Sequence, residues 1–219
     1  MSPKPESLTL YTYFRSSAAF RVRIALNLKG LKPEQVFVHL RRGEHRDAPY
    51  RAINPQAIVP ALMHDGETIA QTLAMIEYLE EIAPIPPLLP ADARDRARVR
   101  RIADIVACEM HPLGNLRVQN YLRDVMGQSE ADVLTWHRHW LTLGFDALEA
   151  LIADDRRTGV FCHGDAPTLA DIFLIPQMAN ARRVEMDLAP YPTLLRIEKA
   201  ALALPAFIDA LPQNQPDAE

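Results

Sequence analysis

The first ninety residues alternate between short apolar runs and longer amphipathic stretches. Leu8–Tyr13 is alternating and rich in aromatic and β-branched side chains, which predicts a strand. A helix is predicted from there to Lys29, because Gly30 stands where a left-handed helix stop is needed. Gln35–His39 predicts a second strand, and the order strand, helix, strand implies a parallel pair with a right-handed crossover. The apolar positions of the helix fall on one face: Ala18, Val22, Ala25 and Leu26.

The next part of the chain predicts an antiparallel hairpin. Two short strand patterns at 61–64 and 67–70 flank Asp65 and Gly66, a pair that readily adopts positive φ and marks a tight turn. The amphipathic pattern of 73–82 predicts a helix that closes the unit. An α+β domain is therefore expected.

Prolines separate this region from the rest of the chain. Ala83–Pro90 holds four prolines in eight residues, which predicts a stiff linker. Thr168 and Asp171 have the spacing of a helix capping box, and we assign them a structural role. A second, all-α domain is expected because helical periodicity recurs in four segments: 92–126, 129–153, 168–181 and 191–210.

Composition and charge exclude several classes of partner. A chain of 219 residues that is 48% hydrophobic can bury a full core, and its net charge of −4 gives no electrostatic footprint for nucleic acid. Its densest basic stretch, Arg94–Arg101, is interrupted by Asp95 and apolar residues and is predicted to be a solvated helix face. No segment approaches the roughly 18 uninterrupted apolar residues of a membrane span, and the N-terminal residues lack the apolar core of a signal peptide. We expect a cytoplasmic protein without nucleic-acid or membrane partners.

The cysteines and histidines point away from disulfide and metal chemistry. Cys108 and Cys162 are too few for a disulfide framework and are expected to be reduced thiols. His137 and His139 are two residues apart, so a helix directs them to opposite sides and they cannot share a metal. His163 has no further ligands nearby. No metal is expected, and no nucleotide either, since the chain has no glycine-rich phosphate loop.

The most informative segment joins the first strand to the first helix. Ser16 and Ser17 stand at the predicted helix start, where unpaired N–H groups and the positive end of the dipole favour an anion. Arg15 beside this positive end is unfavourable unless an anion lies between them. We therefore interpret the turn as a site for a thiolate or a carboxylate.

We call the segment that holds Arg15, Ser16 and Ser17 the serine turn. Five further segments also carry motifs: Arg21–Gly30, Asn54–Leu62, Gln71–Glu80, Gly164–Asp171 and Ile175–Arg183. Together with the serine turn, these segments closely resemble the zeta class of glutathione S-transferases, over nearly the whole chain. The resemblance implies a thioredoxin-like, glutathione-binding domain over residues 1–86. It also implies an all-helical, substrate-binding domain over residues 92–219.

The resemblance implies catalytic roles around the serine turn. Ser16 would steady the thiolate of glutathione, and Ser17 would supply a neighbouring donor or the helix N-cap itself. Arg15 would assist by binding the substrate. Pro60 would be cis, which turns the backbone N–H and C=O of Val59 towards an extended peptide ligand.

The other implied glutathione contacts each have a structural alternative. Thr72, beside Gln71, would bind the γ-glutamyl carboxylate, or would serve only as a helix N-cap. His45 would meet the glycine carboxylate, or would be an exposed loop histidine. His111 would be a donor to glutathione or substrate at the interdomain cleft, or a structural histidine. Asn115 resembles a family residue near glutathione.

Two arginines, and two positions at which the chain differs from the family pattern, bear on substrate binding and reaction. Arg15 and Arg183 would bind a dicarboxylate-type substrate, although Arg183 and its neighbour Arg182 also fit a solvated helix face. Ala18 stands where the family turn carries cysteine, which weakens any reaction that needs an enzymic thiol. Gly114 replaces a usual glutamine, so we expect a more open wall there.

The implied activity is a glutathione-dependent conversion of maleylacetoacetate to fumarylacetoacetate in tyrosine and phenylalanine catabolism. An alternative is isomerisation of maleylpyruvate in aromatic-acid degradation, although Leu116 after Asn115 looks more like the maleylacetoacetate branch. Another alternative is a general glutathione transferase or a glutathione-binding protein. The family's members are usually homodimers, so a homodimer is expected.

Overall fold

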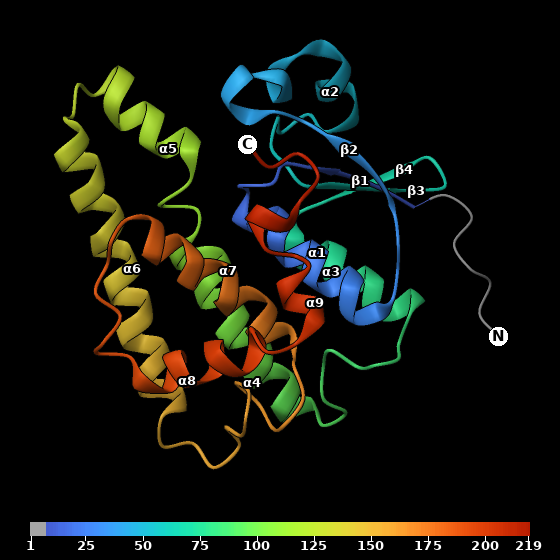
Figure 1. The fold of residues 1–219 in the computed structure, drawn as a ribbon, viewed down its shortest axis with the longest axis vertical. Coiled ribbons are helices and arrows are strands. Elements are labelled where there is room, and N and C mark those ends of the chain that lie inside the picture. Colours follow the sequence, from blue (N-terminus) through green and yellow to red (C-terminus); the bar gives the residue numbers. More distant parts are fainter. Residues whose placement is uncertain (1–7) are drawn as a thin grey trace. The chain divides into compact units, whose positions relative to one another are not determined.

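A computed structural model of the protein describes residues 8–219 and divides them into two compact units (Figure 1). The first contains the described residues through Leu88 together with Ala203–Glu219, and the second is Leu89–Leu202. The sequence predicts a division into 1–86 and 92–219, so the structure differs at the C-terminal end of the chain. Segment 203–219 belongs to the first unit because its helix α9 (Pro205–Ile208) packs against the first helix of the chain.

The first unit is built on a four-stranded mixed sheet with the order β2-β1-β3-β4. β1 pairs in parallel with β2 and antiparallel with β3, and β3 pairs antiparallel with β4. The parallel pair and the antiparallel hairpin are confirmed, and their arrangement is that of a thioredoxin-like domain. The strands are β1 (Leu8–Thr12), β2 (Glu34–Phe37), β3 (Ala61–His64) and β4 (Glu67–Ala70).

Turn chemistry in this unit follows the sequence. Gly30 ends the first helix with a φ of 66°, and its N–H donates to the Asn27 carbonyl at 3.1 Å. Asp65 and Gly66 both have positive φ, as a tight hairpin turn requires. The helices and single turns are α1 (Ser17–Lys29), η1 (Leu40–Arg42), η2 (Glu44–Arg46), α2 (Ala48–Ile53), α3 (Thr72–Ile82), α9 and η5 (Pro212–Asn214).

Helix α1 is buried on more sides than its periodicity predicts. Its arginines Arg21 and Arg23 are only 1% and 4% exposed. The helix contacts α3 and also α9, which comes from the far end of the chain (Figure 1). The prediction of a single apolar face is therefore wrong, because the second packing partner leaves no signal in the local pattern.

The proline-rich linker is bound to the first unit rather than free. Lys29 has a buried side chain that forms an ion pair with Glu80 and donates to the Pro86 carbonyl at 2.6 Å. The Leu88 N–H donates to the Glu80 carboxylate at 3.0 Å. The end of α1, the end of α3 and the linker are thus joined by one buried cation.

The second unit is all-helical, as predicted. The predicted helical segment 92–126 is not continuous, because a non-helical stretch at 111–115 separates the π-helical turn η3 (Ile105–Met110) from α5 (Leu116–Asn120), which runs directly into a second π-helical turn, η4 (Tyr121–Val125). No helix within residues 8–219 has both the length and the apolar character that crossing a bilayer requires. The elements are α4 (Ala93–Asp104), η3 (Ile105–Met110), α5 (Leu116–Asn120), η4 (Tyr121–Val125), α6 (Glu130–Ile152), α7 (Leu169–Arg183) and α8 (Pro192–Ala201).

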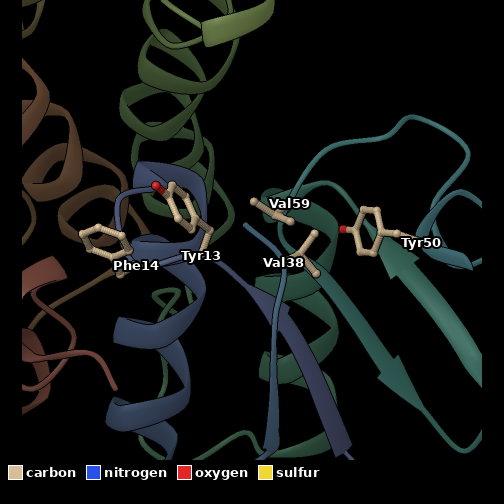
Figure 2. Close-up of a cluster of buried hydrophobic side chains, with 5 residues drawn as sticks. All are labelled: Tyr13, Phe14, Val38, Tyr50 and Val59. Carbon is tan, nitrogen blue, oxygen red and sulfur yellow. The ribbon is translucent and has the colours of Figure 1, made fainter. Parts of the chain in front are cut away.

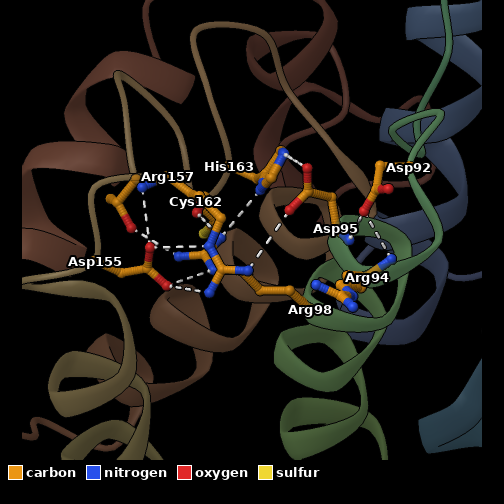
Figure 3. Close-up of polar contacts among 9 residues, drawn as sticks. Asp92, Arg94, Asp95, Arg98, Asp155, Arg157, Cys162 and His163 are labelled. Carbon is orange, nitrogen blue, oxygen red and sulfur yellow. Dashed lines mark hydrogen bonds and ion pairs between the residues drawn. The ribbon is translucent and has the colours of Figure 1, made fainter.

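One arginine of the basic stretch 94–101 is not solvated. Arg98 is 4% exposed and donates to the Asp155 carboxylate at 3.0 Å and the Cys162 carbonyl at 2.7 Å (Figure 3). A third bond reaches the Thr158 hydroxyl at 2.8 Å. The predicted solvated face is wrong at this residue, because Arg98 joins α4 to the loop between α6 and α7.

Candidate active site

Strand β1 leads into α1 through a tight turn that contains Arg15 and Ser16. The Ser16 N–H donates to the Tyr13 carbonyl at 3.0 Å, which closes the turn. Ser16 is the N-cap of α1, and its Oγ accepts a hydrogen bond from the Ala19 N–H at 3.1 Å. Ser17 is the buried first residue of the helix, so its alternative role as the N-cap is wrong.

This cap leaves Ser16 chemically suited to an anion. Capping uses the hydroxyl oxygen as an acceptor, so the O–H proton remains for donation. The same position lies at the positive end of the α1 dipole, and Arg15 precedes it in the chain. A thiolate at the turn would thus be stabilised by a hydroxyl and by helix N–H groups.

The peptide bond between Val59 and Pro60 is cis, as the resemblance implies. The preceding carbonyl, that of Ile58, accepts from the Tyr50 hydroxyl at 2.7 Å and from the Asn54 side chain at 2.8 Å. Within residues 8–219, the N–H and C=O of Val59 make no hydrogen bond to the chain. These two groups can therefore pair with an extended peptide, as a strand does at a sheet edge.

A hydrophobic cluster brings the serine turn and the Val59 loop together. Tyr13 and Phe14, at the start of the turn, are buried in the same cluster as Val38, Tyr50 and Val59 (Figure 2). The Tyr13 and Phe14 rings contact edge to face, with centroids 4.8 Å apart. The packing of these apolar side chains holds two parts of the candidate site that are about forty residues apart in sequence.

Helix α3 begins with a strained residue. Gln71 is the N-cap and has a φ of 71°, a left-handed value that costs a residue with a side chain on the order of 1 to 3 kcal/mol. Thr72 is the first helical residue, so its alternative role as the N-cap is wrong. Strained backbone of this kind clusters at ligand clamps, which supports an anion site at the start of α3.

Arg21 adds a positive charge to this helix start, and sequence reasoning did not assign it a role. Its Nη1 lies 3.5 Å from the Thr72 hydroxyl oxygen, and the side chain is 1% exposed. Because Thr72 accepts this contact, its own O–H remains available as a donor. Nothing in the periodicity of α1 marks Arg21 as buried; the contact with α3 does.

His45 lies in η2 and is half-buried. Burial and the nearby Arg46 lower the pKa of His45 below its ordinary value. Its Nδ1 is buried and has no hydrogen-bond partner within residues 8–219. A neutral imidazole with an unused nitrogen can serve a ligand carboxylate as a hydrogen-bond donor rather than as a fixed charge.

The predicted residues of the second unit lie at helix ends. His111 follows η3 and its N–H donates to the Val106 carbonyl at 2.9 Å. Asn115 is the N-cap of α5, where its side-chain oxygen accepts from the Arg117 N–H at 3.0 Å. The cap uses the oxygen of Asn115 and leaves its NH₂ group for other partners. The ligand contacts of His111 and Asn115 stay predictions.

Arg182 and Arg183 end helix α7 and differ in their surroundings. Arg182 forms an ion pair with Glu198 of α8, which gives it a structural role. Arg183 is exposed, and its charge acts with burial to lower the pKa of His137. Arg182 therefore has a structural partner, and substrate binding by Arg183 stays a prediction.

Gly114 does not leave the open wall that its small size predicts. A Cβ at this position would lie 2.2 Å from Nε2 of His137 and 2.4 Å from its Cδ2, so the imidazole fills the space. The Gln119 side chain donates to the Gly114 carbonyl at 2.7 Å. His137 is buried whereas His139 is exposed, which confirms that they point to opposite sides of α6. Gly114 and His137 are complementary in shape.

The substitution Gly114→Ala should lower the free energy of unfolding by about 1 to 3 kcal/mol, because the new methyl group overlaps the His137 ring. Urea unfolding followed by circular dichroism measures the loss. In a His137→Ala background the same substitution should cost less, because the obstructing ring is gone. An equal loss of stability in both backgrounds would show that overlap with the His137 ring is not the reason why alanine is unfavourable at residue 114.

Residues 8–219 hold no group of three or more His, Cys, Asp or Glu side chains arranged to bind a metal ion. Cys108 is exposed and Cys162 is buried, and no disulfide joins them. The groups that the site offers to a ligand are hydroxyls, backbone groups, helix starts and guanidinium groups, which stabilise anions.

The sheet order, the capped serine turn and the open Val59 backbone define a protein of the glutathione transferase type. Two family models agree: the glutathione S-transferase N-terminal domain matches residues 6–81, and the C-terminal domain matches residues 143–206. The chain belongs to the glutathione S-transferase family.

Individual relatives of similar length are isomerases. The chain is 47% identical to a maleylpyruvate isomerase from Ralstonia sp. over 96% of its length and 99% of the relative. It is also 47% identical to the maleylacetoacetate isomerase of Pseudomonas aeruginosa, over 96% of its length and 98% of that protein.

A solved structure has a closely similar fold. It is the holo form of a maleylpyruvate isomerase, described as a bacterial zeta-class glutathione S-transferase. The TM-score is 0.95 at 47% identity, over 96% of this chain and 100% of that one. A maleylacetoacetate isomerase from Methylobacterium extorquens AM1, with bound malonate and glutathione, superposes with a TM-score of 0.94 at 43% identity, over 96% and 99% of the two chains.

Proposed function

We propose that this chain is a glutathione-dependent isomerase that converts maleylacetoacetate to fumarylacetoacetate. The observation that carries the proposal is the serine turn. Ser16 caps α1 with its oxygen and keeps its hydroxyl proton for an anion at the helix start. Isomerases that match the chain over nearly their full length support the reaction type.

The residues of the first unit fit the chemical groups of glutathione. The unpaired N–H and C=O of Val59 match its central peptide group, and Ser16 matches its thiolate. Thr72, whose hydroxyl oxygen lies 3.5 Å from Nη1 of Arg21, fits the γ-glutamyl carboxylate. His45 fits the glycine carboxylate, since it has a buried nitrogen without an intramolecular partner among the residues described.

When bound, glutathione supplies a thiolate whose reversible addition to the alkene leaves a single carbon–carbon bond that can rotate. The Ser16 hydroxyl and the start of α1 favour that thiolate, because a free thiol has a pKa of about 8.5 and both groups lower it. Ser17 contributes a further donor at the helix start. Ala18 leaves the turn without a thiol of its own, so the chain contributes no second nucleophile there.

The substrate is an anion, and two arginines are proposed to bind it. Arg15 and Arg183 would each hold a carboxylate or the negative charge that develops on the substrate carbonyl oxygen. His111 would donate a hydrogen bond to substrate or glutathione, and Asn115 would contact glutathione. No redox change occurs, and glutathione leaves unaltered.

The test follows the ultraviolet absorbance of maleylacetoacetate and maleylpyruvate with purified protein, with and without glutathione. Loss of the cis substrate that depends on glutathione would support the isomerase, and the ratio of the two kcat/KM values would identify the preferred substrate. If glutathione binds but neither substrate is consumed, the proposal fails. A halogenated alkanoate would then be used to assay conjugation.

Maleylpyruvate isomerisation is a second candidate. It is favoured by the 47% identity to the Ralstonia protein and by the TM-score of 0.95 to a holo maleylpyruvate isomerase. The two substrates share the cis double bond and the carboxylate and differ in chain length. The same serine turn therefore serves both reactions.

The main proposal also places the reaction in tyrosine catabolism, inside the cytoplasm, and assigns the chain a homodimeric state. These properties are implied by the resemblance to the zeta class. Light scattering of the purified protein at micromolar concentration measures the mass of the particle. A mass of one chain would exclude the homodimer.

A further inference from the structure

A buried arginine of α1 donates hydrogen bonds to the backbone at the start of the serine turn. Arg23 donates through Nη1 to the Tyr13 carbonyl at 3.4 Å and through Nη2 to the Phe14 carbonyl at 3.1 Å. Its Nη1 also donates to the Thr12 hydroxyl at 3.2 Å. The side chain is 4% exposed, and burial lowers the pKa of Arg23 to about 10, so it remains charged at neutral pH.

A second contact comes from the other end of the chain. The Phe14 N–H donates to Oδ2 of Asp217 at 2.9 Å, although 203 positions separate the two residues. The carboxylate of Asp217 also raises the pKa of Arg23, which opposes the effect of burial. The N–H of Phe14 and the carbonyls of Tyr13 and Phe14 are therefore bound by two charged side chains from outside the turn, those of Asp217 and Arg23.

The segment that carries Asp217 is itself anchored to α1. The Ala210 carbonyl accepts from Nε of Arg23 at 3.1 Å, and the Ala206 carbonyl accepts from the Asn27 side chain at 2.9 Å. Arg23 thus binds the serine turn with one side of its guanidinium and segment 203–219 with the other. A displacement of the segment would be transmitted to the turn through Arg23 and through Asp217.

We propose that Asp217 is a positioning residue for the serine turn: with Arg23, it fixes the backbone at Tyr13 and Phe14 and so sets the place of Arg15 and Ser16. This inference rests on the proposed function, because it assigns the turn the task of holding the glutathione thiolate. Asp217 acts through the Phe14 N–H.

The geometry explains why such a contact affects catalysis. Ser16 follows Phe14 by two residues, and its own N–H is bonded within the turn to the Tyr13 carbonyl. Freedom at Phe14 therefore moves both ends of the turn hydrogen bond. A small misplacement of a group that stabilises a reacting atom is costly, since catalysis depends on held orientation.

Kinetics of three variants test the proposal. Asp217→Ala should lower kcat/KM for the cis substrate by roughly tenfold, mainly through kcat, because the turn loses a hydrogen bond to a charged acceptor. Asp217→Asn removes the same charge but keeps an oxygen acceptor, and should stay within about threefold of the parent protein. The matched control is Asp209→Ala, which removes an exposed carboxylate from the same segment and should leave the kinetics unchanged.

Two outcomes would overturn the positioning role. One is a kcat/KM for the Asp217→Ala protein equal to that of the Asp209→Ala protein. The other is an Asp217→Asn protein as impaired as the alanine variant, which would mean that the charge matters and the hydrogen bond does not.

A second measurement does not depend on the reaction. Hydrogen exchange of the Phe14 amide, followed by NMR, should be faster in the Asp217→Ala protein and unchanged in the Asp209→Ala protein. Equal exchange in these two variants overturns the inference whatever the activity. If the parent protein turns over neither cis substrate but Phe14 exchange responds as expected, the proposed function fails while the contact between Asp217 and the turn stands.

Discussion

The substitution Ser16→Ala is expected to lower kcat for isomerisation by roughly 100- to 1,000-fold, the range found when a preorganised donor to a developing anion is removed. The hydroxyl accepts the Ala19 N–H as the cap of α1, so its proton is the donor that alanine loses. Glutathione binding should weaken far less, because Val59, Thr72 and His45 are untouched. Steady-state kinetics and calorimetric titration with glutathione measure the two quantities.

The cap itself must be separated from the donor. Ser16→Ala also removes an N-cap, which costs about 0.5 to 2 kcal/mol of stability. Ser129→Ala removes the equivalent side chain from the start of α6, where Ser129 accepts the Asp132 N–H at 3.1 Å. That variant should lose similar stability and keep its activity. If Ser16→Ala reduces turnover and glutathione binding by the same factor, Ser16 has no catalytic role.

The second large effect is expected on stability, at Asp171. This residue is fully buried and accepts three hydrogen bonds, from the Cys162 N–H at 2.8 Å, the Thr168 N–H at 2.8 Å and the Thr168 hydroxyl at 2.9 Å. Asp171→Ala should lower the free energy of unfolding by about 3 to 5 kcal/mol, because two buried N–H groups lose their acceptor. Chemical unfolding in urea measures the change.

A matched control lies in the same unit. Asp132 occupies the equivalent position of the capping box of α6, but it is exposed. Asp132→Ala should cost about 1 kcal/mol or less, because water replaces its hydrogen bonds. Equal losses of stability for the two variants would show that the burial of Asp171 and its bond to Cys162 add nothing to the free energy of unfolding beyond the contribution of a capping box.

The elements that sequence predicts well are those whose signals are local. The stop at Gly30 and the turn at Asp65 and Gly66 each depend on the φ values that a few adjacent residues allow. The capping box of Thr168 and Asp171 is confirmed for the same reason, since its hydrogen bonds span three residues. Helix α1 was found, but not its burial, because α9 comes from the far end of the chain.

The residues of the candidate site also differ in whether a local signal marks them. The sequence motifs mark the serine turn and the pair Val59–Pro60, and the structure confirms the cis peptide but places the cap at Ser16 rather than at Ser17. Arg21 was missed because only the packing of α1 on α3 brings it to Thr72. The prediction of open space beside Gly114 is wrong because the ring of His137, on helix α6, fills that space.

Local sequence patterns predict the succession of strands and helices, the break at the prolines, the serine turn and the family resemblance, because each depends on neighbouring residues or on short motifs. Which charged side chains are buried, and what they bind, is known only from the folded chain. Arg23 and Asp217 illustrate the reason: they are 194 positions apart, and only the folded first unit brings both to the backbone of one turn.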